Sequence, residues 1–398
     1  MRNGQGPAPI IRGFLRRPLM IRTFIAVLLL AVAAVPAFAQ SSPILPAPPT
    51  LAARAWILID AQSRQVLVSR DPDRRVEPAS LTKVMTAYLT FDALKQKRIT
   101  LDQIAKVSER GYRAEGSRMF LDPKIPATVE DLLKGMVVQS GNDATITLAE
   151  TVAGSEDTFV DLMNKQAARM GLKNTHFMNS TGLPDAQHYS TARDLAQLAA
   201  NLIRDFPEYL TLYSTKEFRY NNITQYNRNR LLSMDPAVDG LKTGFTESAG
   251  YCLIATAKRD PRRLISVVLG TASDTARAME SQKLLNYGFQ FYESVKLYGR
   301  DEAVTRIPVF KGAENELKAG FRDDIVVTIP AGMKPKLEAT LESMQPLIAP
   351  IPAGQRVGTL KLTLDGKPFG EYPVLALDTI PVASFLGRTW DSLRLMFK

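Results

Sequence analysis

The chain has 398 residues, of which 45% are hydrophobic and 23% charged, and its formal net charge is +10. The length exceeds one typical domain and the composition is that of an ordinary globular protein, which excludes a fibrous or an intrinsically disordered chain. The single cysteine, Cys252, excludes an internal disulfide, and its apolar strand context predicts a buried, unreactive thiol. The only histidines, His176 and His188, have no metal-ligand spacing around them, so we expect neither a metal site nor a cofactor.

Residues 1–39 have the pattern of a secretory signal peptide. They carry five arginines and no acidic residue, followed by an apolar run at 24–35 and by Ala37-Phe38-Ala39, after which cleavage is expected. A membrane span is the alternative, but the run is shorter than the roughly 20 residues that cross a bilayer. Arg16-Arg17 leaves twin-arginine export open beside the general secretory route. Removal of the five arginines lowers the net charge to +5, which is too mild to indicate nucleic acid and fits attraction to anionic lipid or wall polymer.

After a proline-rich tether at 40–50, strands and helices predict an α+β domain over residues 51–300. Two strand patterns at the start read as a hairpin, helical patterns fill the middle, and two strands and a helix close the domain. The terminal strands are expected to pair in one antiparallel sheet. The strand patterns lie at 55–60, 65–68, 251–257 and 264–269, and the helical ones at 81–95, 129–138, 145–152, 157–170, 191–203 and 275–291.

From about residue 301 short strand patterns alternate with turn residues, which predicts a small all-β domain over 301–379. This segment contains no histidine or cysteine, which favours a supporting role over chemistry. The strand patterns lie at 304–309, 324–329, 336–341, 357–364 and 371–377.

The last segment, residues 380–398, predicts an amphipathic helix that lies on a membrane. Its apolar and aromatic side chains fall within an arc of about 140°, and its arginines lie outside that arc. The alternative is a terminal helix packed on a core.

Ser80 and Lys83 stand one helical turn apart at the start of the helix predicted over 81–95. A serine hydroxyl is a poor nucleophile unless an adjacent base activates it, and Lys83 shares its helix face. The orphan N–H groups of a helix start also favour negative charge. The alternative is an N-cap serine beside a surface lysine, because one Ser-x-x-Lys is expected by chance in such a chain.

Two further motifs follow at separations of about 60 and 100 residues, and the order of all three makes coincidence improbable. Ser140-Gly141-Asn142 separates two helical patterns, so its hydroxyl and amide can project from a turn into a cleft. Lys242-Thr243-Gly244 is expected on an edge strand, where Gly244 lets a ligand approach the backbone closely.

With these motifs the chain resembles the low-molecular-mass penicillin-binding proteins of the 5/6 type, a family of serine-type D-alanyl-D-alanine carboxypeptidases. Local strings agree at 77–83, 140–144 and 239–244. The resemblance spans nearly the whole chain, and it implies a β-lactamase/transpeptidase-like catalytic domain, a small all-β domain and a terminal membrane-anchoring helix.

By that resemblance, Ser80 attacks the carbonyl carbon between two terminal D-alanines of a peptidoglycan stem and forms an acyl-enzyme, with Lys83 as the base. Lys83 must be neutral when it takes the proton. The like charge of Lys242 nearby would help, since it lowers a lysine pKa.

The resemblance also implies how the rest of the cleft acts. Ser140 would relay a proton to the leaving amine, and Asn142 would bind the substrate amide. Backbone N–H groups of Ser80 and of Phe245 or Thr246 would form the oxyanion hole.

For the terminal carboxylate the resemblance implies Lys242 and Thr243, with Arg277 as a further candidate whose alternative is a solvated charge at a helix end. Arg193 is expected in a structural ion pair. Some relatives have histidine after Lys-Thr-Gly, whereas this chain has Phe245.

Three other functions are weighed against this one. A class A β-lactamase deacylates with a glutamate between the second and third motifs, but residues 179–185 offer none, so slow release of penicillin is expected. A D,D-endopeptidase acting on cross-links would use the same machinery. A non-catalytic wall-binding shape protein would not need a nucleophile with its base.

The expected partners are stem peptides that end in D-Ala-D-Ala, β-lactam antibiotics and the inner-membrane surface, with no nucleic acid. The expected location is the periplasmic face of the inner membrane.

Overall fold

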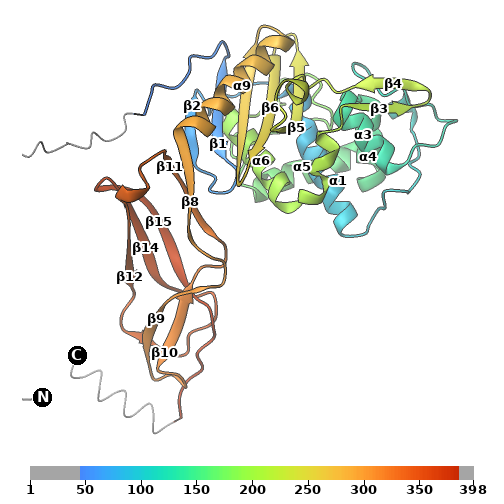
Figure 1. The fold of residues 1–398 in the computed structure, drawn as a ribbon. Coiled ribbons are helices and arrows are strands. Elements are labelled where there is room, and N and C mark those ends of the chain that lie inside the picture. Colours follow the sequence, from blue (N-terminus) through green and yellow to red (C-terminus); the bar gives the residue numbers. More distant parts are fainter. Residues whose placement is uncertain (1–44, 385–398) are drawn as a thin grey trace, which may run out of the picture. The chain divides into compact units, whose positions relative to one another are not determined.

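The computed structural model of the chain describes residues 45–384 (Figure 1). The predicted signal peptide, the first part of the tether and most of the predicted anchor helix lie outside these residues. The described part of the tether, 45–50, has no regular secondary structure, and the hydroxyl of Tyr287 donates to the Pro46 carbonyl at 2.7 Å.

A five-stranded antiparallel sheet forms the centre of the first part of the chain. Its order is β2 (Val66–Arg70), β1 (Ala55–Asp60), β7 (Arg262–Thr271), β6 (Gly250–Arg259), β5 (Val238–Thr246). The pairing of β1 with β7, from Ala55 opposite Leu269 to Asp60 opposite Leu264, confirms that the two ends of the predicted domain meet in one sheet. Because β5 is at the edge, one side of the strand that carries the Lys-Thr-Gly motif has no neighbouring strand.

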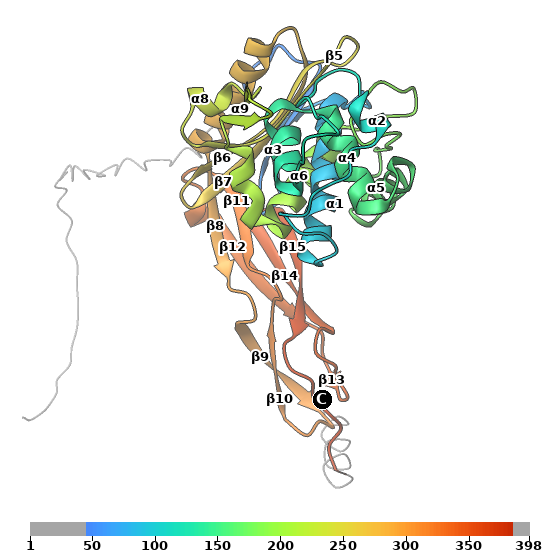
Figure 2. The same cartoon turned by 90° about the vertical axis from the view of Figure 1, so that its right-hand side faces the viewer.

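Helices cover both faces of this sheet. On one face α9 (Asp274–Phe291) contributes Leu284 and Leu285 to a core that also holds Trp56 and Leu58 of β1. On the other face a larger group of helices, gathered together in Figure 2, contributes to a second core. These helices are α1 (Lys83–Lys95), α3 (Val129–Lys134), α4 (Asn142–Ala153), α5 (Glu156–Arg169) and α6 (Ala192–Asp205).

Helix starts follow the polar signals in the sequence. Thr128 and Asp131 form a reciprocal capping box at α3, and Thr191 caps α6 by accepting from the Asp194 N–H. The helix predicted at 129–138 is present, but it changes from α to π geometry at Gly135 and continues as η2 (Gly135–Gln139). The shorter helices are η1 (Ala79–Thr82), α2 (Glu109–Tyr112), η3 (Pro207–Tyr209), α7 (Leu210–Tyr213), α8 (Leu231–Met234) and η4 (Lys334–Lys336).

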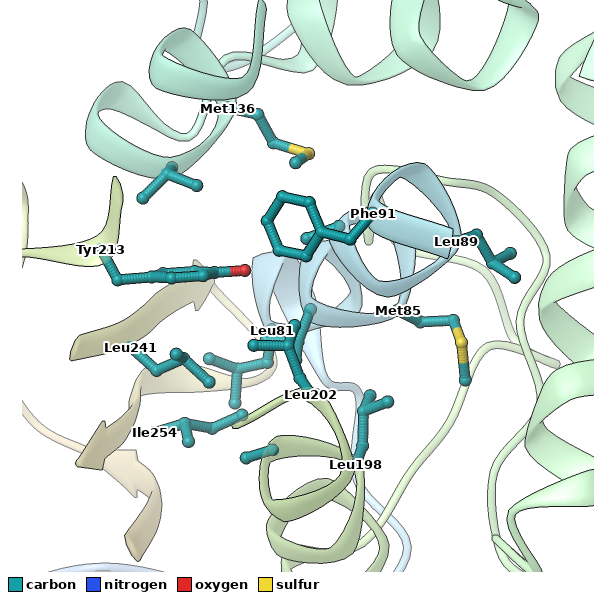
Figure 3. Packing of buried hydrophobic residues seen from close by; sticks show 14 of the residues in the cluster. Leu81, Met85, Leu89, Phe91, Met136, Leu198, Leu202, Tyr213, Leu241 and Ile254 are labelled. Atoms are coloured by element: carbon teal, nitrogen blue, oxygen red, sulfur yellow. The ribbon is translucent and has the colours of Figure 1, made fainter. Parts of the chain in front are cut away.

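The larger core lies directly behind two of the sequence motifs. Leu81 follows Ser80, Leu241 precedes Lys242, and both side chains are buried in the same cluster (Figure 3). Figure 3 shows Tyr213 and Phe91 converging on this cluster from other elements. Because packing in protein interiors is tight, the shared core fixes the two motif-bearing segments relative to each other.

The strands β3 (Glu217–Tyr220) and β4 (Ile223–Tyr226) form a hairpin that the hydrophobic pattern does not predict. Each strand has only four residues, too few for a clear alternation. The available sequence signal for this hairpin was the pair Asn221-Asn222 in its turn. Both residues have positive φ, at 48° and 59°, as hairpin turns require.

The later part of the chain forms β-sheets around a separate core. A six-stranded sheet has the order β12, β14, β15, β10, β9, β13, and β11 pairs with β8. The predicted strands correspond to β9 (Ala303–Phe310), β11 (Ile325–Pro330), β12 (Leu337–Ser343), β14 (Arg356–Leu364) and β15 (Lys367–Ala376), whereas β8 (Tyr292–Tyr298), β10 (Glu316–Gly320) and β13 (Leu347–Ile348) were not expected.

Because of strand β8, the second core begins earlier in the chain than the predicted boundary at residue 301. This strand follows α9 without a linker, pairs with β11, and contributes Val295 to the later core. Residues before the predicted boundary at 301 therefore pack with the all-β part, and the absence of a linker explains why composition alone placed the boundary late.

At the other end, residues 380–384 of the predicted anchor helix are not helical. Ile380 and Val382 form backbone bridges to Ile351 and Gly312, which hold them in an extended conformation. Within residues 45–384 no helix is both long enough and apolar enough to cross a membrane.

Candidate active site

A cavity of about 360 Å³ at the edge strand β5 brings the three sequence motifs together. Each motif contributes to its walls: Ser80 from the first, Ser140 from the second, and Thr243 and Gly244 from the third. The remaining lining residues are Ser117, Asn227, Arg228, Arg230, Phe245, Tyr251, Asp274 and Arg277.

Ser80 lies in the 3-10 turn η1, and the α-helix begins three residues later at Lys83. The turn is held from outside by the loop that carries Gly182. Gly182 has φ +85°, and a Cβ there would overlap the carbonyl group of Ala79, so only glycine permits this approach. The turn that carries Ser80 therefore lies between this loop and the larger core, to which Leu81 belongs.

Lys83 is buried, with 1% of its surface exposed. Its Nζ lies 2.9 Å from Ser80 Oγ, 2.7 Å from Asn142 Oδ1 and 2.7 Å from the Thr181 carbonyl oxygen. The pKa of Lys83 is lowered to about 7, mainly by burial and next by the positive charge of Arg228, while two buried carboxylates oppose the shift. Burial and Arg228, rather than the predicted Lys242, are thus the main causes of the lowered Lys83 pKa, and the repulsion between the two lysines lowers the pKa of Lys242.

Lys242 joins the second and third motifs. Its Nζ donates to Ser140 Oγ at 2.9 Å and to the Thr243 carbonyl at 3.0 Å. Burial lowers its pKa well below the usual value, and the charges of Lys83 and Arg228 add to the effect. Ser140 has φ +64°, uncommon for a residue with a side chain, where η2 gives way to α4, and this turn directs its hydroxyl toward Lys242.

Both polar atoms of the Asn142 side chain are hydrogen-bonded within the protein, and Asn142 does not line the cavity. Its Oδ1 accepts from Lys83, and its Nδ2 donates to the Glu115 carbonyl at 2.6 Å. The neighbouring Asp143, which sequence reasoning missed, accepts from the N–H groups of Met119 and Leu121 at 2.9 and 3.0 Å. The Ser-Gly-Asn turn therefore also organises the loop that brings Ser117 to the cavity.

Arg277 lies in the cavity wall with 6% of its surface exposed, which excludes the alternative of a solvated charge at a helix end. Its guanidinium donates to the carbonyl groups of Gly244 and Arg228 at 3.2 and 3.3 Å. A cation thus stands beside the strand that carries Thr243, where a carboxylate would find both charge and hydrogen bonds.

Arg228 is one of the cavity residues that sequence reasoning missed. Its side chain is exposed, and in the described part of the chain its guanidinium has no hydrogen bond or ion pair; partial desolvation in the cavity wall lowers its pKa. Its backbone is fixed between Asn227 and Asn229, whose side-chain amides donate to the carbonyl groups of Thr215 and Gly240. This Asn-Arg-Asn string, ahead of the Lys-Thr-Gly strand, was the available signal.

Other predicted residues lie outside the cavity wall. Arg193 forms the expected ion pair, with Asp73 at 2.7 and 3.0 Å. Cys252 is buried, and burial raises its pKa to about 11. Burial lowers the pKa of His188 to about 4, and its ring bonds to Thr82 at 2.9 Å. Across residues 45–384, no three His, Cys, Asp or Glu side chains come together as metal ligands would.

Comparison with known proteins agrees with this geometry. Residues 42–273 match the model of a family described as D-alanyl-D-alanine carboxypeptidase, and residues 292–382 match the C-terminal domain of penicillin-binding protein 5. The chain is 42% identical over 357 residues to D-alanyl-D-alanine carboxypeptidase DacC of Escherichia coli, covering 88% of this chain and 89% of that protein.

Solved structures give the same result. Penicillin-binding protein 5 of Haemophilus influenzae is 39% identical, with a TM-score of 0.81 over 84% of this chain and 99% of that one. Penicillin-binding protein D2 of Listeria monocytogenes, solved with ampicillin bound, is 31% identical with a TM-score of 0.57, covering 61% of this chain and 100% of that one. The predicted transpeptidase-like α+β fold is therefore confirmed, and the chain belongs to the serine-type D-alanyl-D-alanine carboxypeptidases.

Proposed function

We propose that Ser80 is the nucleophile and Lys83 the base of this carboxypeptidase. The observation that carries the proposal is the 2.9 Å contact between Lys83 Nζ and Ser80 Oγ, together with burial that lowers the pKa of the amine to about 7. A neutral Lys83 takes the hydroxyl proton as Oγ bonds to the carbonyl carbon between two terminal D-alanines.

Other groups are assigned to protonate the leaving amine and to bind the oxyanion. As the C–N bond breaks, the D-alanine amine takes a proton from Ser140, which Lys242 Nζ contacts at 2.9 Å and can resupply. The oxyanion is bound by backbone N–H groups of Ser80 and Phe245, which line one cavity. Water then hydrolyses the acyl-enzyme and frees Ser80.

The terminal carboxylate is assigned to Thr243 and Arg277, which line the cavity together, with the charge of Lys242 behind them. Gly244 is not assigned to ligand approach, because a Cβ there would meet Pro78, Ala79 and Leu81 at 3.1–3.3 Å; its missing side chain lets the turn that carries Ser80 pack against β5. Asn142, whose amide is bonded to Lys83 and Glu115, is assigned to positioning Lys83.

β-Lactams are proposed to acylate the same serine, because they carry a reactive carbonyl beside a carboxylate. The Listeria relative solved with ampicillin supports this assignment. Release is expected to be slow, since the loop at 179–185 presents the Thr181 carbonyl to Lys83 and contains no glutamate. Cleavage of cross-links would use the same residues and remains the second candidate.

The N-terminal pattern and the tail at 380–398 support export and attachment to the periplasmic face of the inner membrane, where peptidoglycan stems are available.

The test is Ser80→Ala, which removes the attacking oxygen. We expect neither release of D-alanine from a diacyl-Lys-D-Ala-D-Ala peptide nor covalent labelling by a fluorescent penicillin. Ser214→Ala, at an exposed serine, is the matched control and should keep both. Labelling of the Ser80→Ala protein would disprove the assignment, and a parallel assay with a cross-linked dimer decides between carboxypeptidase and endopeptidase action.

A further inference from the structure

Two aromatic side chains in the cavity wall have no task in the proposed reaction. Phe245 follows Gly244 on β5, and Tyr251 is its direct partner on β6. Their ring centroids are 4.3 Å apart, with the planes tilted by 36°. Phe245 is nevertheless 49% exposed, so an apolar ring stays uncovered in a cavity whose other walls are mainly polar or charged.

The two rings lie next to Arg277, the cation assigned to the terminal carboxylate of the substrate. The guanidinium carbon of Arg277 lies 5.5 Å from the centroid of the Tyr251 ring, within the range of a cation–π contact. Arg277, Tyr251 and Phe245 therefore form an unbroken row along one side of the cavity. A substrate carboxylate bound by Arg277 and Thr243 would place its α-carbon in the part of the cavity that Tyr251 and Phe245 line.

We propose that Phe245 and Tyr251 form a specificity surface for the side chain of the C-terminal residue of the substrate, and that this surface favours apolar side chains larger than the methyl group of D-alanine. The inference rests on the proposed function and adds the determinant of its terminal-residue selectivity.

The preference follows from burial and charge. An apolar side chain covers the exposed ring of Phe245 and leaves water with it, which is favourable. A charged side chain would lose hydration against the rings without gaining a partner. A cationic one would also face the positive charges of Arg277 and Arg228 in the cavity wall.

The test compares peptides that differ only in the last residue, ending in D-Ala-D-Ala, D-Ala-D-Leu, D-Ala-D-Phe and D-Ala-D-Lys. The unmodified protein should release D-leucine and D-phenylalanine at least as efficiently as D-alanine, and D-lysine at least about tenfold less efficiently in kcat/KM. Phe245→Ala keeps the backbone N–H assigned to the oxyanion and removes only the ring. It should lower kcat/KM for the D-leucine and D-phenylalanine peptides about tenfold, mainly through KM, and for the D-alanine peptide less than about threefold.

Two further variants separate a specific surface from general damage. Phe245→Leu keeps an apolar side chain and should recover part of the preference. Tyr226→Ala removes a 67% exposed aromatic ring on β4 that does not line the cavity, and should leave the ratios between the four peptides unchanged.

The outcomes distinguish this inference from the proposed function. If the intact protein releases D-alanine but Phe245→Ala changes all four peptides by one factor, or if the intact protein rejects D-leucine and D-phenylalanine, the specificity surface is disproved and the carboxypeptidase assignment stands. If the intact protein releases no terminal residue from any peptide, both are disproved.

Discussion

Lys83 has a lowered pKa because the fold removes it from water. No residue close to it in sequence accounts for this, since burial is the largest cause and Arg228, 145 positions further along the chain, is the next. The short spacing of Ser80 and Lys83 on one turn made the pair predictable. The roles of Arg228 and of the Thr181 carbonyl were not, because they depend on which distant segments fold against α1.

The lowered pKa predicts how activity depends on pH. Below about 7 Lys83 is protonated and cannot accept the Ser80 proton, so the rate of Ser80 acylation should rise with pH through about 7 and level off above it. Arg228→Gln removes a positive charge that lowers the Lys83 pKa, so the rising limb should move to higher pH by roughly one unit.

The matched control is Arg230→Gln. Arg230 borders the same cavity and is exposed like Arg228, but it is ion-paired with Asp274 at 2.6 Å, so its replacement should leave the limb in place. Acylation rates with a chromogenic β-lactam across pH give the measurement. If the rising limb of the pH profile stays at the same pH in Arg228→Gln, the charge of Arg228 is not a cause of the lowered Lys83 pKa.

Among the elements, long periodic helices and buried strands were predictable and short ones were not. The capping box of Thr128 and Asp131 identifies the start of α3, because its hydrogen bonds are local. In contrast β8, at Tyr292–Tyr298, was missed because it follows α9 without a turn signal. Its pairing with β11 is a long-range contact that no local pattern encodes.

The loop at Gly182 provides a prediction at this scale. Gly182→Ala places a Cβ in the carbonyl group of Ala79, at a φ of +85°. Because that carbonyl is a backbone group and cannot rotate away, the loop itself must move away from Ser80. We expect the free energy of unfolding to fall by at least about 3 kcal/mol, from the combined strain and overpacking. Acylation of Ser80 should slow as well, since the loop carries the Thr181 carbonyl.

Gly354→Ala is the control for backbone strain alone. It has nearly the same φ, +86°, but a Cβ there meets nothing within 4 Å, so only about 1–2 kcal/mol should be lost and acylation should be unchanged. Denaturant unfolding and penicillin acylation measure the two effects. Equal losses in both variants would show that the approach to Ala79 is unimportant.

For the molecule as a whole, the sequence predicted the order of its parts better than their limits. The motifs and the change to short strands indicated a catalytic part followed by an all-β part, which the two family matches reproduce. The extent of the anchor stays a prediction, and residues 380–384 are extended because their backbones pair with Ile351 and Gly312.

Deletion of residues 385–398 tests the anchor while leaving the bridge between Val382 and Gly312 in place. We expect the truncated protein to move from the membrane fraction to the soluble fraction of cells, because the predicted apolar face is removed. Release of D-alanine from a soluble peptide should be unchanged. The same distribution for both proteins would disprove membrane attachment through this tail.

The three contacts of Lys83 have a consequence for the direction of proton transfer. Asn142 Oδ1 and the Thr181 carbonyl can only accept hydrogen bonds, whereas the Ser80 hydroxyl can either accept or donate. A neutral amine with two protons gives both to the fixed acceptors, which leaves its lone pair facing Ser80. The amine is then fully hydrogen-bonded in both protonation states. Only the direction of its hydrogen bond with Ser80 changes between them. The lone pair of this lysine is thus aimed at the serine by the two groups that cannot donate to it.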